Sequence, residues 1–222
     1  LYKYKDSLRD WEQSIHIPLF VWGLCWWFGA GMHEINHFVA NQQLVLNLFV
    51  AMFTGSLLLA HYLEHKLAWR MLRYAVLGQL YVMLVMLWML FMIRQDHPLG
   101  DYGWLTWPAA VTALYFFLYR YRATVKSEVL QWQHIIGFWF LLGFISWEAA
   151  WLMDEYIGGR AWRDAMYGLA PALIMLALFR KGRMLRWPVA VHYDWYAGYA
   201  AIPVMLLLGL FALAMGLLHQ GN

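Results

Sequence analysis

The chain has 222 residues, of which 63% are hydrophobic, 19% are aromatic and only 13% are charged. Soluble domains carry about 25% charged residues and could not bury this much apolar surface, so the composition excludes an ordinary soluble domain. The formal net charge is +3, but the basic residues flank apolar stretches and form no separate basic face, so no nucleic-acid partner is expected.

The apolar stretches predict membrane-spanning helices. Each needs roughly 20 apolar residues, and it must be helical because lipid offers the backbone no hydrogen-bond partner. Stretches of about this length without Asp, Glu, Lys or Arg lie at 38–63, 74–93, 102–119, 129–147 and 195–222. In chain order, the pattern predicts helices at about 15–38, 43–65, 71–93, 103–122, 131–153, 162–180 and 195–218. We therefore expect an all-α fold, a polytopic transmembrane helical bundle of about seven spans in one domain over residues 1–222.

The basic residues predict how these helices are oriented. Of the 16 Lys and Arg residues, 13 fall on one side of the predicted membrane: Lys3, Lys5, Arg9, Lys66, Arg70, Arg73, Arg120, Arg122, Lys126, Arg180, Lys181, Arg183 and Arg186. The other side has Arg94, Arg160 and Arg163. Because basic residues are retained on the cytoplasmic side, we expect a cytoplasmic N-terminus and a periplasmic C-terminus in a bacterial inner membrane, with membrane lipids as partners.

The stretch HEINH, at residues 33–37, has the spacing of a metal site. His33 and His37 lie one helical turn apart with Glu34 between them, which suits zinc or iron. The reversed motif HYLEH holds His61 and His65 at the other end of the next helix, ~27 Å along its axis, so the two motifs cannot share an ion. Of the two pairs, His33 and His37 are the better metal candidates but would need a third ligand, and we expect no metal and no cofactor.

Motifs for several enzyme classes are absent from the sequence. It contains no G-x-x-x-x-G-K-[ST] loop for a nucleotide and no G-x-S-x-G nucleophile elbow. The single cysteine, Cys25, excludes a disulfide framework or a multi-cysteine metal centre within the chain. These absences favour a non-enzymatic protein.

A short pattern, W-x-x-A-x-x-x-[DE], occurs twice. It runs from Trp27 to Glu34 and from Trp147 to Asp154, and the tetrapeptide RMLR follows each copy after one intervening helix. The two copies predict a parallel internal repeat in which the first three helices match the last three, with units at 15–93 and 131–218. Chance could also produce matches as short as these.

The strongest functional candidates gather near the predicted outer ends of the helices. Glu148 is an acidic residue well within a span, and such residues tend to face a cavity or a partner. For Glu148, the alternative is a structural hydrogen bond or a carboxylate that reaches the membrane surface. Tryptophans at this depth usually form an interfacial belt, which is the alternative for the tryptophans. We expect an outward-facing acidic and aromatic ligand-binding cluster made of Glu34, Glu148, Asp154, Trp27, Trp104, Trp107, Trp147 and Trp151.

Four stretches carry a resemblance to a known family: WWFGAGMHEI, HPLGDYGWLTWPAA, WEAAWLMDE and RWPVAVH. They resemble segments of large bacterial predicted membrane proteins, the domain of unknown function 2339, over about 15–205. Residues that match are Glu34, His97, Pro98, Trp104, Trp107, Pro108, Trp147, Glu148, Trp151, Trp187 and Pro188. The resemblance implies that this chain is an internal piece of a longer protein, whose remaining spans would be partners. It implies no activity.

Together these observations predict a multi-pass bacterial inner-membrane protein. A transporter-like protein or a scaffold that organises the cell envelope is favoured, with a homo-oligomer left open. The alternative is an intramembrane enzyme acting on a lipid or a lipid-linked sugar. A metal- or haem-binding protein is a minor alternative.

Overall fold

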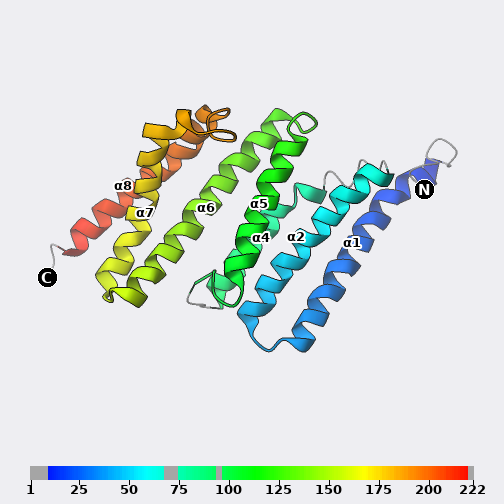
Figure 1. The fold of residues 1–222 in the computed structure, drawn as a ribbon, viewed down its shortest axis with the longest axis horizontal. Coiled ribbons are helices and arrows are strands. Elements are labelled where there is room, and N and C mark those ends of the chain that lie inside the picture. Colours follow the sequence, from blue (N-terminus) through cyan, green and yellow to red (C-terminus); the bar gives the residue numbers. More distant parts are fainter. Residues whose placement is uncertain (1–9, 68–74, 94–96, 220–222) are drawn as a thin grey trace. The chain divides into compact units, whose positions relative to one another are not determined.

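The computed structural model describes residues 10–67, 75–93 and 97–219, which form seven α-helices and no β-strand (Figure 1). The helices are α1 (Asp10–Phe38), α2 (Gln42–Leu67), α4 (Gln79–Met92), α5 (Gly103–Tyr121), α6 (Ser127–Tyr156), α7 (Arg160–Lys181) and α8 (Ala201–His219). A 3-10 turn, η2 (Gly182–Met184), follows α7, and a π-helix, η3 (Trp195–Ala200), leads into α8. The all-α prediction is confirmed.

Each predicted helix overlaps an observed one. The helix expected at 71–93 begins outside the described residues, and the described part is interrupted by a turn at 77–78 before α4. Of the 16 basic residues used to predict orientation, Lys3, Lys5, Arg9, Arg70, Arg73 and Arg94 also lie outside the described residues.

Within the residues that the structure describes, three helical segments are long and apolar enough to cross a membrane: Gln42–Glu64, Ser127–Tyr156 and Trp195–Gly216. At 1.5 Å per residue, the 30-residue α6 is ~45 Å long, more than the ~30 Å hydrocarbon core. The 14-residue α4 is apolar but shorter. The arrangement of seven spans and the internal repeat stay predictions.

The packing contacts divide the chain into two units. The first unit consists of residues 1–95 and 99–117, and the second of residues 96–98 and 118–222. α5 passes from the first unit into the second after Phe117. The single domain expected over residues 1–222 stays a prediction.

In the first unit, α1 and α2 form a hairpin, and α4 packs against α2 (Figure 1). The helices of the hairpin approach closely at Gly31, where a Cβ atom would clash with the side chain of Met52. The fully buried Gln79 donates hydrogen bonds to Thr54 Oγ1 on α2, at 3.0 Å, and to the carbonyl oxygen of Ala110 on α5, at 3.1 Å. One buried amide therefore ties the start of α4 to two other helices.

In the second unit, α6 and α7 form a second hairpin (Figure 1). Its turn contains Gly158 and Gly159 with φ of 72° and 99°, a left-handed conformation that glycine adopts without steric cost. α7 and α8 approach closely at Gly168, where a Cβ atom would lie 2.5 Å from the ring of Phe211 on α8. The small residue therefore allows α7 and α8 to pack together.

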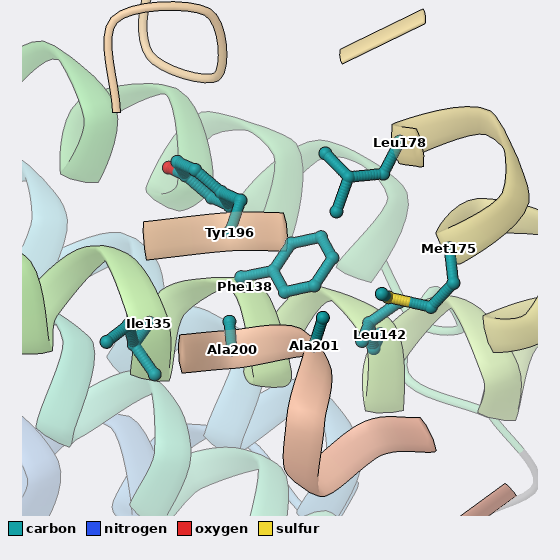
Figure 2. Close-up of a cluster of buried hydrophobic side chains, with 8 residues drawn as sticks. All are labelled: Ile135, Phe138, Leu142, Met175, Leu178, Tyr196, Ala200 and Ala201. Atoms are coloured by element: carbon teal, nitrogen blue, oxygen red, sulfur yellow. The ribbon is translucent and has the colours of Figure 1, made fainter. Parts of the chain in front are cut away.

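The core of the second unit joins α6, α7 and the π-helix η3 (Figure 2). Its buried side chains are Ile135, Phe138, Leu142, Met175, Leu178, Tyr196, Ala200 and Ala201. The indole of Trp139 donates a hydrogen bond to the carbonyl oxygen of Ala200, at 3.0 Å, and so connects α6 to the end of η3. α6 thus packs against both α7 and η3 in this unit.

Candidate functional site

Glu148 lies on α6, beyond the uncharged stretch 129–147, and only 8% of its surface is exposed. An ionised carboxylate is costly to bury in apolar surroundings unless a cation or a hydrogen-bond donor faces it. The partner of Glu148 is therefore the first question about this site.

His97 provides that partner. Its Nδ1 atom lies 3.0 Å from Oε2 of Glu148, and the two side chains are 19% and 10% exposed. Its imidazole also stacks on the indole of Trp151, with ring centroids 3.6 Å apart and planes inclined by 12°. Glu148 and Trp151 are three residues apart and so lie on the same face of α6. We call these three residues the Glu148 cluster.

The Glu148 cluster has the geometry of a proton-exchanging pair. An ionised carboxylate can only accept hydrogen bonds, so Nδ1 of His97 then carries the proton and Nε2 is the basic nitrogen of the ring. The carboxylate and the indole together fix the position of the imidazole. A histidine oriented in this way can act as a general base or relay a proton.

Asp154 lies one turn beyond the cluster and has a different environment. Its Oδ2 atom is 3.4 Å from Nη1 of Arg163 on α7, and Arg163 also reaches Asp164. These side chains are 37% to 44% exposed, where an ion pair contributes little to stability. Trp147 is half-buried on the same helix. Their predicted ligand contacts stay predictions.

The other four predicted site residues belong to the first unit. Glu34 is exposed on α1, and the indole of Trp27 donates to Ser56 Oγ at 2.9 Å. Trp104 is 62% exposed at the start of α5, whereas Trp107 is fully buried. The eight predicted residues are therefore divided equally between the two units.

Trp107 is part of a buried hydrogen-bond network. Its indole donates to Oδ1 of the fully buried Asn47, at 2.9 Å. The amide nitrogen of Asn47 donates to the carbonyl oxygens of Gly100 and Asp101, at 2.9 and 3.1 Å. Asp101 and Tyr102 have φ of 45° and 62°, which is strained for residues with a side chain. Trp107 thus supports this turn through Asn47, and its predicted ligand contact stays a prediction.

A second polar cluster, not predicted as a site, lies towards the other end of α6. Nδ1 of the buried His134 is 2.7 Å from the hydroxyl of Tyr196 on η3. The ring of His192 lies 5.2 Å from that of His134 and stacks on Trp195 at 3.9 Å. Burial lowers the pKa of His192 below its ordinary value of 6.5. The sequence feature that could have indicated this cluster is the polar pair Gln133 and His134 within an apolar stretch.

The family model of a predicted membrane protein (DUF2339) matches residues 12–221. The chain belongs to this family. The resemblance inferred from its motifs is confirmed, and the protein is a membrane protein of unknown function. Neither a curated protein nor a solved structure matches the chain.

In this DUF2339 protein, two of the stretches that carry the family resemblance supply the Glu148 cluster. His97 begins HPLGDYGW, and Glu148 and Trp151 lie in WEAAW. His33 and His37, the metal candidates, are exposed on α1. Within the described residues, no three His, Cys, Asp or Glu side chains gather where they could hold a metal ion. The Glu148 cluster is therefore the best-defined candidate site.

Proposed function

We propose that this protein is a transporter-like membrane protein in which the Glu148 cluster binds a polar ligand and exchanges a proton with it or with solvent. The observation that carries the proposal is the contact of 3.0 Å between His97 and Glu148, next to a stretch of α6 that has no charge. An ionisable residue such as Glu148 within an apolar helix is costly and tends to serve transport or proton relay.

The distribution of charge supports an outward-facing site. In the second unit, α6 and α7 meet near the cluster at a turn followed by two basic residues, Arg160 and Arg163. The opposite ends of the helices carry Arg120, Arg122, Lys126, Arg180, Lys181, Arg183 and Arg186. By the positive-inside rule, the Glu148 cluster then lies towards the periplasm.

The transport proposal can be tested in liposomes that contain a trapped pH-sensitive dye. Monosaccharides, disaccharides, glycerophosphodiesters and choline would be added one at a time, and the internal pH followed. We expect at least one compound to move protons with the wild-type protein. Glu148→Gln should abolish this movement because the variant keeps the shape of the side chain but cannot ionise. Glu155→Gln, at an exposed position of the same helix, is the matched control.

Two results would contradict the proposal: no proton movement with any compound, or equal movement in wild type and Glu148→Gln. Trp151→Leu adds a second comparison, since it removes the surface on which His97 stacks and keeps the ionisable pair. An envelope-organising scaffold would tolerate all three substitutions without a change in proton movement.

A second candidate function is an enzyme that acts on a lipid-linked sugar. The specific observation in its favour is that one imidazole contacts both a carboxylate and an indole face, an arrangement suited to removing a proton from a hydroxyl group. Mass spectrometry of membrane lipids from cells that overproduce the protein would test it. A new lipid species in wild type but not in His97→Gln would support the enzyme, and identical lipid profiles would exclude it.

A further inference from the structure

The connection between α7 and η3 mixes exposed apolar and exposed basic side chains. It follows Lys181 and runs from Gly182 to Asp194. Met184, Leu185 and Val191 are 83%, 50% and 66% exposed. Arg183 and Arg186 flank the first two of them and are also exposed. Large apolar side chains between arginines are typical of segments that lie in the boundary between lipid headgroups and acyl chains.

Three exposed arginines, Arg122, Arg183 and Arg186, lie at this end of the second unit. Within the described part of the chain, no carboxylate lies within 4.0 Å of the guanidinium groups of Arg122, Arg183 or Arg186. Arg163, at the other end, contacts both Asp154 and Asp164. Among the described residues, no carboxylate therefore balances the positive charge of these three arginines, which favours an anionic partner.

Aromatic rings hold two of these arginines in place. The guanidinium of Arg183 lies 4.9 Å from the ring centroid of Tyr193, and a Cβ atom at Gly182 would lie 2.9 Å from the same ring. The guanidinium of Arg122 lies 3.9 Å from the ring of Tyr119. Stacking on a ring fixes the plane of a guanidinium while its N–H groups remain available at the edge.

Contacts between aromatic rings link Arg122 to the connection between α7 and η3. The ring of Tyr119, which carries Arg122, packs edge-on against Trp187 with centroids 4.9 Å apart. Trp187 in turn packs against the buried His134 of α6, at 5.9 Å. Arg122 and the connection therefore lie next to packed aromatic rings, those of Tyr119, Trp187 and His134.

We propose that Arg122 and the connection 182–191 form a docking surface for anionic phospholipids. Arg122, Arg183 and Arg186 contact the phosphate groups, for which guanidinium has a matching planar set of donors. Met184 and Leu185 lie at the start of the acyl chains. A lipid accounts for both the charge and the exposed apolar side chains, since an anionic headgroup lies directly above hydrocarbon. This proposal is independent of the function proposed for the Glu148 cluster.

Native mass spectrometry of the full chain in detergent tests the proposal, with phosphatidylglycerol and phosphatidylcholine titrated separately. We expect phosphatidylglycerol to bind more tightly. Arg183→Gln/Arg186→Gln should weaken its binding roughly fivefold for each arginine, from about 1 kcal/mol per basic residue at an anionic surface. Phosphatidylcholine binding should change little. Arg160→Gln, an exposed arginine at the opposite end, should leave both lipids unaffected.

Two further variants make the outcome decisive. Arg183→Lys/Arg186→Lys keeps the charge and should retain the preference for phosphatidylglycerol, which guards against a folding defect in the glutamine variant. Met184→Asn/Leu185→Asn removes the apolar contact and should weaken the binding of both lipids. Equal affinity for the two lipids in wild type, or equal losses in the Arg160 variant and the glutamine double variant, would overturn the proposal.

Discussion

Replacing Asn47 with alanine tests how strongly the turn before α5 depends on one buried amide. The substitution removes three hydrogen bonds, two to the carbonyl oxygens of Gly100 and Asp101 and one from the indole of Trp107. A buried polar group left without its partner costs about 1–3 kcal/mol. The indole N–H is fully enclosed and should cost near the upper part of that range, whereas the part-buried carbonyls can recover water. We therefore expect Asn47→Ala to lower the free energy of unfolding by about 3 kcal/mol.

The assay is reversible unfolding in mixed micelles with increasing sodium dodecyl sulfate, followed by far-ultraviolet circular dichroism. Trp107→Phe should cost less, since it leaves the two carbonyl bonds of Asn47 in place. A double-mutant cycle should yield a coupling energy of about 1 kcal/mol for the indole–amide bond. Asn36→Ala, at an exposed position of α1, is the control. If Asn47→Ala and Asn36→Ala differ by less than about 0.5 kcal/mol, the network does not support the turn and the reasoning fails.

Two further predictions concern the polar residues around His134 on α6. Tyr196→Phe removes the hydroxyl that lies 2.7 Å from His134 and should lower the free energy of unfolding by about 1–2 kcal/mol, whereas Tyr199→Phe, on an exposed residue of the same π-helix, should have little effect. Equal effects in the same unfolding assay would refute the role of that bond. For His192, the lowered pKa means that the fold prefers the neutral ring. The contribution of the neutral His192 ring to the free energy of unfolding is complete above pH 6.5 and is lost as the pH falls through the lowered pKa. Wild type should therefore lose more stability between pH 7.5 and pH 5 than His192→Phe. This variant keeps an aromatic ring on Trp195 but cannot be protonated. Parallel pH profiles for the two proteins would contradict this prediction.

Glu148 and His134 both lie on α6, but their polar partners differ. They are ~21 Å apart along the axis of α6 at 1.5 Å per residue, so no hydrogen bond joins them directly. Glu148 faces His97, which lies in a different stretch of the chain, while His134 faces η3 of the core. The first cluster combines an acid and a base and is the better candidate for proton exchange. The second consists of rings and a hydroxyl and is better suited to holding η3 against α6.

Much of the fold follows from the sequence because hydropathy acts locally. A run of some 20 residues without charge specifies a helix in lipid whatever lies beside it, and the helices observed overlap those predicted. The family motifs were likewise visible as short contiguous segments, and the match over residues 12–221 confirms them. Glu148 was also singled out without any knowledge of its partner, because an acidic residue in an apolar helix is costly.

Only the tertiary structure decided which residues meet. His97 and Glu148 are 51 positions apart, and the pairing depends on how the segment before α5 packs against α6, which no local pattern encodes. Trp107 and Asn47 are 60 positions apart, and no local pattern in the sequence indicated that they form a hydrogen bond. His134 and Tyr196 are 62 positions apart. Hydropathy determines that a segment is a helix in lipid, whereas the face that each helix turns to its neighbours depends on packing along its whole length, and that packing determines the chemistry of the site.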